Sequence, residues 1–163
     1  MAILIRDAVD ADLDALKAMY DQECLFGQAT FHTEPMPRSL WENRLASPHP
    51  GDQMLVAVED DVVLGAAWST EYRNRAAYDG TREVSVYLTP EGQGRGLGRQ
   101  LYGVLVPRLR SAGVHTLLAV VALPNDASVR LHESVGFTRV GTFREVGRKF
   151  DRWIDVTFLQ LLL

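Results

Sequence analysis

A glycine-rich turn, Gln93-Gly94-Arg95-Gly96-Leu97-Gly98, is the sequence feature that most constrains the fold. It follows residues 83–88, where polar and apolar side chains alternate as they do on a strand with two distinct faces. It precedes a segment from about Gly96 to Ser111 that is expected to be helical, with Pro107 kinking the helix or loosening its last turn. The order strand, glycine turn, helix places an adaptable backbone directly at a helix N-terminus.

Such a turn is suited to binding an anion. Glycine lets the backbone approach a ligand closely, successive N–H groups point at one place, and the helix N-terminus adds about half a positive charge. Arg95 and Arg99 can supply further counter-charge. The spacing is neither the dinucleotide motif G-x-G-x-x-G nor a P-loop, which needs Gly-Lys-Ser/Thr. We therefore expect a pyrophosphate site here, and the alternative is a glycine-rich connection that binds nothing.

The rest of the chain predicts a single domain over residues 1–163, a length that suits one hydrophobic core. Asp10 is expected to cap a first helix, in which Leu13, Leu16 and Met19 recur at helical spacing. Later helices are expected from Ser39, from Gly96 and from Pro124–Asp126, the last closed by Gly136. Strands are expected at residues 3–5, 54–58, 62–69, 83–88, 114–122, 140–143 and 153–162. The order β-α-α-β-β-β-α-β-α-β-β indicates one mixed sheet with helices packed on it, an α+β fold.

The composition of the chain limits the kinds of partner that it is expected to bind. The net charge of −4 argues against a general nucleic-acid or anionic-membrane partner. The single cysteine, Cys24, excludes an internal disulfide and the usual thiol metal sites, so no metal is expected. Neither a signal-peptide stretch nor a run of ~20 apolar residues is present, and we expect a cytoplasmic protein.

Several separate segments together resemble one family. These are the glycine turn, Glu83-Val-Ser-Val-Tyr-Leu88, the segment from Leu123 to Glu133, the tail from Gly147 to Asp155, and Phe31-His-Thr-Glu-Pro35. The chain resembles the GCN5-related N-acetyltransferase (GNAT) superfamily over essentially its whole length, and within it the phosphinothricin and methionine sulfoximine acetyltransferases. The resemblance implies a three-layer α/β/α arrangement around a mostly antiparallel sheet.

The resemblance also implies acetyl-CoA as cofactor. The turn would wrap its pyrophosphate, the strand after Glu83 would run beside the pantetheine arm, and the start of the helix after residue 122 would bond the same arm. The implied cofactor-binding residues are Val86, Tyr87, Leu88, Gln93, Gly94, Arg95, Gly96, Leu97, Gly98, Asn125 and Ser128.

The chemistry of amine acetylation points to two catalytic candidates. An alkyl ammonium titrates near ~10 and must lose a proton before it can attack. Glu83, on the strand beside the cofactor, is the candidate base, and a backbone N–H around Tyr87 is the candidate donor to the oxyanion. His132 stands where many superfamily members carry a proton-donating tyrosine, and it is the candidate acid for the leaving thiolate. The reverse assignment, with His132 as base, stays open.

The substrate is expected to be a small amino acid that carries an acid group, because the fork-shaped guanidinium of Arg73 or Arg75 suits a carboxylate or phosphinate. The resemblance adds neighbours from the same loop and from the 31–35 segment. The expected substrate-binding residues are Phe31, Glu34, Arg73, Arg75, Tyr78, Thr81, Arg82 and Glu83.

Two other functions remain open: the same fold acting on protein N-termini or lysines, and a non-catalytic acyl-CoA-binding module. The subfamily also implies antibiotic or herbicide resistance and a homodimer. The apolar last strand, with Phe158, Leu159 and Leu161 to Leu163, is the expected dimer interface.

Overall fold

The computed structural model describes residues 2–163, which form one seven-stranded sheet with helices on both faces. The strands are β1 (Leu4–Asp7), β2 (Met54–Glu59), β3 (Val62–Glu71), β4 (Thr81–Leu88), β5 (Thr116–Ala122), β6 (Thr138–Lys149) and β7 (Arg152–Leu162). The helices are α1 (Leu13–Phe26), α2 (Arg38–Leu45), α3 (Leu97–Ser111) and α4 (Asp126–Ser134), and short 3-10 turns precede α1, β4 and the glycine turn. None of the helices in this part of the chain is long and apolar enough to cross a membrane.

The sheet has the strand order β1-β2-β3-β4-β5-β7-β6 and is antiparallel except between β4 and β5. The predicted order of helices and strands is confirmed. The largest difference is β6, which extends from the expected residues 140–143 to Thr138–Lys149. Its second half is charged and largely exposed, so it carries no apolar alternation, and pairing with β7 makes it a strand.

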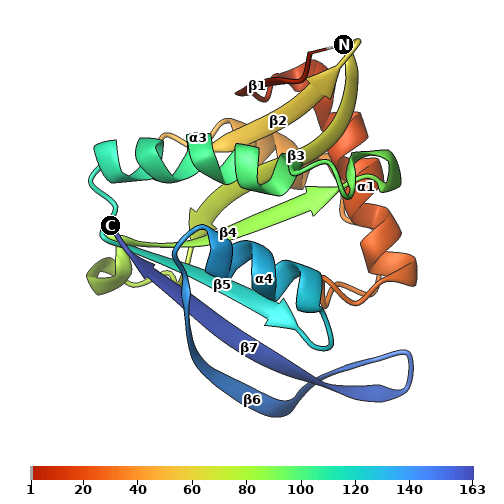
Figure 1. Cartoon of the computed structure of the whole chain (residues 1–163), viewed down its shortest axis with the longest axis vertical. Helices are drawn as coiled ribbons and strands as arrows, with labels where there is room; N and C mark the ends of the chain where they lie inside the picture. The colour runs from red at the N-terminus through yellow and green to blue at the C-terminus, as the bar shows by residue number, and fades with distance from the viewer. Residues whose placement is uncertain (1) are drawn as a thin grey trace.

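Two hydrophobic cores lie on opposite faces of the sheet. In Figure 1, α3 and α4 lie over the face turned to the viewer, and β6 and β7 form a long hairpin at the lower edge. The core on that face joins α3, α4 and inward residues of the strands, among them Leu101, Leu105 and Leu117. The other core joins α1 and α2 to the opposite face, through Leu13, Leu16 and the other residues of that cluster. The predicted α/β/α layers are therefore confirmed.

The predicted cap of the first helix is wrong. Asp10 begins a 3-10 turn, and α1 starts only at Leu13. The carboxylate that holds this corner is Asp12, which accepts a hydrogen bond from the N–H of Val9 at 2.8 Å and is paired with Arg6. Asp12 is buried, and the Arg6 guanidinium holds the pKa of its carboxyl below the usual value.

The last strand is an interior strand rather than an edge. β7 lies between β5 and β6, and Leu159 is fully buried in the core under α3. The expectation that the apolar residues of β7 form a dimer interface therefore does not fit Leu159. The free edge on this side belongs to β6, whose residues are mostly exposed.

The connection from β4 to the glycine turn packs tightly against β3. Gly92 is buried, and a Cβ there would overlap the backbone carbonyl of Leu64. Gly103, on the exposed side of α3, has open space around it.

We expect Gly92→Ala to destabilise the protein by about 1–3 kcal/mol, because the backbone of β3 must move to make room. The matched substitution Gly103→Ala is expected to stabilise it by about 0.5–1 kcal/mol, through helix propensity alone. Urea unfolding of both variants measures the difference, and equal midpoints would contradict the packing argument.

Candidate active site

β4 and β5 pair only at their beginnings. The parallel register joins Thr81 to Thr116, Arg82 to Leu117 and Glu83 to Leu118, and among the described residues it stops there. Beyond Glu83 and Leu118 the two strands separate. Backbone groups that would have bonded across the sheet therefore face an opening.

Two hydrogen bonds show which backbone groups of β4 face this opening. The N–H of Thr89 donates to Leu64 in β3, and the carbonyl of Gly80 accepts from Thr116 at the start of β5. Since peptide groups alternate sides along a strand, the N–H groups of Val86 and Leu88 point toward the opening and that of Tyr87 points into β3. The oxyanion donor expected around Tyr87 would therefore come from a neighbouring residue.

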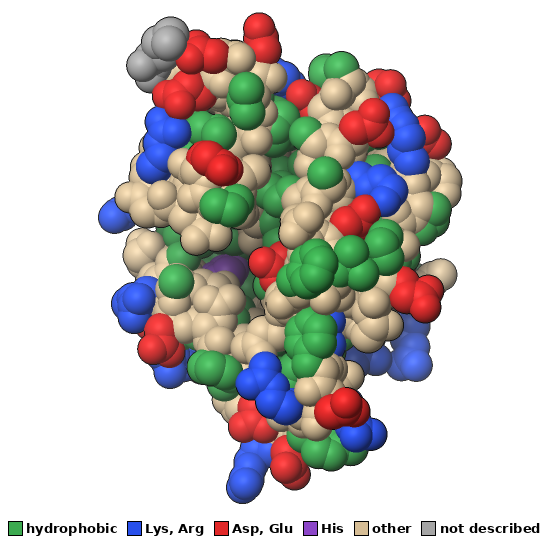
Figure 2. Space-filling view, turned by 90° about the vertical axis from the view of Figure 1, so that its right-hand side faces the viewer, with side chains coloured by type: hydrophobic (Ala, Val, Ile, Leu, Met, Phe, Trp, Pro, Cys, Tyr) green, Lys and Arg blue, Asp and Glu red, His purple; other side chains and the backbone are tan. Residues whose placement is uncertain are grey.

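A cavity of about 420 Å³ occupies the opening and extends to the glycine turn. β4 and β5 form its sides, and the N-termini of α3 and α4 form one end. Figure 2 shows this part of the surface as a hollow with hydrophobic side chains along it and a histidine at its base. Of the residues expected to hold the cofactor, the cavity is lined by Val86, Tyr87, Leu88, Gln93, Gly94, Gly96, Leu97, Gly98, Asn125 and Ser128.

The glycine turn has the geometry of an anion cradle. Gly94 and Gly96 both have φ +72°, which favours glycine, and a Cβ at either would have no neighbour within 4 Å. Gly96 is the N-cap of α3 and has no side chain to bond the first N–H groups of the helix, so these groups remain available at the turn. Gly98 serves packing instead, since a Cβ there would lie 2.7 Å from Leu131 of α4.

The two arginines of the turn differ in position. Arg99 lines the cavity. Arg95 is held outside it by Glu59, which accepts two hydrogen bonds at 2.8 and 3.0 Å from the guanidinium. Arg95 can therefore contribute its backbone to the turn, while its side chain is hydrogen-bonded to Glu59 at the end of β2.

Asn125 caps α4. Its side-chain oxygen accepts a hydrogen bond of 3.1 Å from the N–H of Ser128, and both residues line the cavity. A second N-terminus, that of α4, is thereby fixed beside the opening.

A second cavity, of about 300 Å³, lies on the other face of β4 and contains Glu83. It shares Ala29, Ser85, Tyr87, Val120 and Ala122 with the first cavity, so the two adjoin along β4 and β5. The alternation predicted for residues 83–88 is confirmed. Glu83, Ser85 and Tyr87 line this second cavity, while Val84, Val86 and Leu88 pack in the core under α3.

Burial raises the pKa of Glu83, and the positive charge of Arg44 partly opposes this rise. A carboxylate with a raised pKa is a stronger base than an exposed one, and Glu83 lies two residues along β4 from Ser85, which lines both cavities. The arrangement suits the removal of a proton from a group that enters the second cavity.

Aromatic rings and a loop form the other walls of the Glu83 cavity. Tyr87 stacks on Trp68 at 5.1 Å with an interplanar angle of 7°, and its hydroxyl donates to the carbonyl of Ala29. Phe31 lines the cavity and packs against Gly147, where a Cβ would overlap the ring. Lys149 donates to the carbonyls of Glu23 and Thr30 at 2.7 and 3.0 Å. The segment before Phe31 is therefore held to the end of β6.

His132 is buried at the base of the first cavity, and both of its ring nitrogens have partners. Nδ1 lies 2.7 Å from the carbonyl of Ser128, which can only accept, so Nδ1 carries the proton. Nε2 lies 2.8 Å from the hydroxyl of Tyr102, which therefore donates to it. Burial lowers the pKa of His132, and the bond to Ser128 partly opposes this. His132 is thus a neutral histidine with a fixed tautomer.

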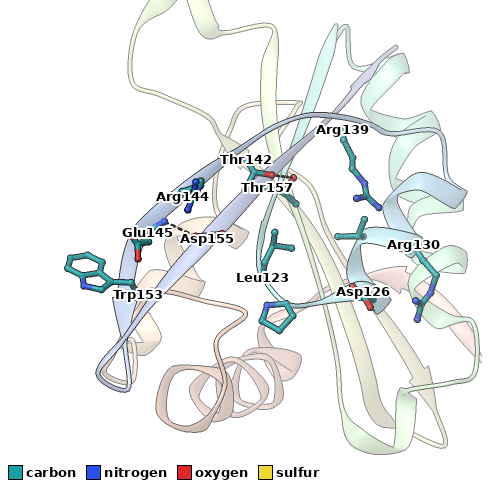
Figure 3. A pocket seen from close by; sticks show the side chains of 12 residues that line it. Leu123, Asp126, Arg130, Arg139, Thr142, Arg144, Glu145, Trp153, Asp155 and Thr157 are labelled. Carbon is teal, nitrogen blue, oxygen red and sulfur yellow. Dashed lines mark hydrogen bonds between the residues drawn. The ribbon is translucent and has the colours of Figure 1, made fainter.

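A third cavity, of about 580 Å³, lies between α4 and the β6–β7 hairpin and shares no lining residue with the other two. Figure 3 shows arginines and carboxylates around it, with Trp153 at one end and hydrogen bonds joining Thr142 to Thr157 and Glu145 to Asp155. Its lining carries charges of both signs, and it contains neither Glu83 nor the glycine turn. We therefore assign the chemistry to the two adjoining cavities.

Comparison with known proteins decides the family. A family model described as an acetyltransferase (GNAT) domain matches residues 5–158. The chain belongs to the GNAT acetyltransferases. It is therefore an enzyme of the acyltransferase class, and its cofactor is acetyl-CoA.

Three similar proteins illustrate the range of this family. An L-methionine sulfoximine/L-methionine sulfone acetyltransferase of Salmonella typhimurium is 38% identical, with 98% of this chain and 94% of the relative covered. A phosphinothricin acetyltransferase of Sinorhizobium meliloti, solved with acetyl-CoA, has a TM-score of 0.93 at 34% identity, covering 100% of this chain and 89% of that one. A ribosomal-protein-alanine N-acetyltransferase of Brucella melitensis has a TM-score of 0.91 at 35% identity, covering 98% and 99%.

The GNAT cofactor fits the residues present. The open cradle of glycine backbone at the N-terminus of α3 suits phosphate groups, and the free backbone edge of β4 suits the amides of a pantetheine arm. Arg99 is the cation that lines this end of the cavity.

The expected substrate residues of this GNAT enzyme are not all brought together. Phe31 and Glu83 line the second cavity, whereas Glu34, Arg73, Arg75, Tyr78 and Thr81 are absent from its lining. Arg82 lies on the other face of β4, buried at 2% exposure, with Nε 3.2 Å from a carboxylate oxygen of Asp52. It therefore packs the structure away from the Glu83 cavity.

Sequence reasoning missed Arg44, Tyr20 and Trp68, which also line this cavity. One signal was present in α2: Trp41 and Arg44 are three residues apart and so share a helix face. Which sheet residues meet that face depends on how α2 packs, and the sequence does not contain this directly.

We expect His132 to remain neutral, with the proton on Nδ1, when the pH falls below the ordinary histidine pKa of ~6.5. Nitrogen-15 NMR of the imidazole measures both the tautomer and the titration. Tyr102→Phe removes the donor to Nε2 and should raise the pKa of His132 relative to the wild type. A doubly protonated ring at pH 6.5 in the wild type would contradict the assignment.

Proposed function

We propose that this GNAT enzyme transfers an acetyl group from acetyl-CoA to the amino group of a small amino acid, such as phosphinothricin, methionine sulfoximine or a related compound. The observation that carries the proposal is the Glu83 cavity, which adjoins the cofactor cavity along β4 and β5. At about 300 Å³ it is at the lower end of the range for small-molecule sites. The names of the relatives described above support the same class of substrate.

The proposed cofactor site uses the glycine turn from Gln93 to Gly98 for the pyrophosphate. The backbone edge of Val86 and Leu88 then lies beside the pantetheine arm, with Asn125 and Ser128 on its other side. Acetyl-CoA supplies an acetyl group activated as a thioester. Everything else in the reaction is assigned to residues of this chain.

Glu83 is the proposed general base. It accepts a proton from the substrate ammonium, either directly or through one water, and leaves a neutral amine facing the junction of the two cavities. The N–H of Val86 or Leu88 is the proposed donor to the oxygen on which negative charge develops, because these groups point toward the opening.

His132 does not suit the role of base, because its Nε2 already accepts from Tyr102. We propose that it acts through Ser128, whose hydroxyl lies 3.4 Å from Nδ1 and lines the cofactor cavity. The hydroxyl of Ser128 then donates a hydrogen bond to the departing thiolate, which takes its proton from solvent, while His132 keeps its Nδ1 proton and holds Ser128 in place.

Acetylation of a protein N-terminus is the second candidate, and the similarity to the Brucella enzyme favours it. The packing of Phe31 against Gly147 narrows the Glu83 cavity and supports the small-molecule proposal. A non-catalytic acyl-CoA-binding module would not need the buried carboxylate of Glu83. We also propose that the enzyme works in the cytoplasm, where its free cysteine, the buried Cys24, stays reduced.

A thiol-release assay with acetyl-CoA tests the function directly. We expect turnover with amino acids such as phosphinothricin and methionine sulfoximine and little with peptides that mimic protein N-termini. The absence of thiol release with every amine would refute the enzymatic proposal.

We expect Glu83→Gln to lower kcat/KM by about 10²–10⁴-fold, because the base is lost. In the wild type, the acidic limb of the pH profile should lie above the usual pKa of a glutamate, since Glu83 must be ionised to act and burial raises its pKa. Glu71→Gln, at the exposed end of β3, is the matched control and should keep both activity and profile.

Glu83→Gln should also raise the melting temperature at pH 7. A raised folded-state pKa means that the protonated carboxyl is the stable form, and that stability is lost as the pH rises through this pKa. The gain should vanish near pH 4, where the wild-type carboxyl is protonated. A lower melting temperature at pH 7 would contradict the assignment.

A homodimer is the proposed assembly. The free edge of β6 and the hairpin beyond it expose large apolar side chains, among them Val140, Phe143, Val146 and Trp153. Such a surface is unusual for a monomer. Sedimentation should give twice the mass of the chain, and Phe143→Lys should shift the equilibrium toward monomer, while Val62→Lys, an exposed site on β3, should not. A monomeric wild type at micromolar concentration would refute it.

A further inference from the structure

Arg44 is a partly buried cation for which residues 2–163 supply no counter-ion. It lies in the last turn of α2, and its guanidinium carbon sits 5.0 and 5.5 Å from the ring centres of Trp41 and Trp68. Within residues 2–163, no carboxylate approaches it closely enough for an ion pair, and its Nη1 is buried without a hydrogen-bond partner.

The neighbouring charges do not compensate for this burial. Burial lowers the pKa of Arg44, and Tyr20, Tyr87 and Glu83 partly oppose the effect. Asp52, which lines a small neighbouring cavity together with Arg44, lies beside Arg82 instead. Removing a guanidinium from water is costly unless a paired anion or a strong acceptor replaces the water.

The cavity next to Arg44 is where such an anion would fit. Arg44 and Glu83 both line the same 300 Å³ space, and no ion pair joins them. One wall therefore carries a cation and another carries an acid that accepts protons. A zwitterionic amino acid has the complementary pattern, with its ammonium and its carboxylate on one carbon.

We propose that Arg44 binds the α-carboxylate of the amino-acid substrate and thereby selects amino acids over the corresponding amines and amides. The inference rests on the proposed function, and it replaces the expectation that Arg73 or Arg75 performs this task. Arg73 and Arg75 are exposed and lie outside the cavity lining. The Arg44 guanidinium lies against both tryptophan rings, and lysine lacks the fork geometry that suits a carboxylate.

The test compares a free amino acid with its α-carboxamide, which keeps the amine and the side chain. For phosphinothricin, Arg44→Gln should lower kcat/KM on the order of 100-fold, mainly through KM, because the lost contact is made before and during the reaction. For the α-carboxamide, kcat/KM should change by less than about threefold. The wild-type preference for the acid should therefore disappear.

Two further variants separate recognition from folding. Arg38→Gln makes the same change in the same helix, at a surface arginine that is paired with Asp10 and Asp14, and it should leave both substrates unaffected. Arg44→Lys keeps the charge and loses the fork, so it should fall between the wild type and Arg44→Gln for the acid only. Acetyl-CoA binding and the melting temperature should stay close to the wild type in any variant that is compared.

Equal losses for acid and carboxamide in Arg44→Gln would overturn the inference and leave the proposed function intact. If the wild-type enzyme turned over no amine at all, that result would instead overturn the proposed function. Calorimetric binding of phosphinothricin then tests Arg44 on its own: binding that the wild type shows and Arg44→Gln lacks supports the site, and binding by neither protein, or equally by both, overturns it.

Discussion

The separation of β4 from β5 after Glu83 and Leu118 is the constraint on which the rest of the structure depends. A continuous parallel ladder would have used the peptide groups of Val86 and Leu88 for sheet bonds. Their separation leaves these groups facing a cavity, at the place where the N-termini of α3 and α4 also arrive. Unpaired backbone groups are costly when dry, so the opening persists because water or a polar ligand can bond to it. A long polar cofactor meets that requirement along its whole length.

The same separation lies beside two partly desolvated charged groups, the carboxylate of Glu83 and the guanidinium of Arg44. Glu83 is the last residue of β4 in the ladder, and the sheet face beneath it is covered by α1, α2 and the segment through Phe31. Burial raises the pKa of Glu83 and lowers that of Arg44, and in both cases it favours the neutral form. The opposite charge of the other residue partly opposes each shift. Neither is fully compensated by the other. This residual mismatch costs stability in the free enzyme and favours a ligand that carries both charges.

The sequence predicts much of this arrangement because the relevant signals are local. The alternation from Glu83 to Leu88 placed the right side chains on each face, and the glycine spacing predicted the turn. The same alternation puts Arg82 on the face opposite Glu83, but its pairing with Asp52, in the loop before β2, is a tertiary contact that the local pattern does not contain. Arg44 was missed because its environment is made by Trp68, from a strand more than twenty residues away. Charges that are defined by tertiary packing leave little trace in a local pattern.

The family resemblance predicted the position of His132, but its chemical role depends on hydrogen bonds that only the structure shows. His132 lies beside the cofactor cavity, as expected, but its bonds to Ser128 and Tyr102 keep it neutral and use both nitrogens. A strong acid is not required there, because a thiol titrates near ~8.5 and its thiolate is a stable leaving group close to neutral pH. A neutral imidazole that fixes the hydroxyl of Ser128 is sufficient for that step. The demanding proton transfer is the one from the substrate ammonium, and Glu83, a carboxyl whose pKa is raised by burial, lies on that side of β4.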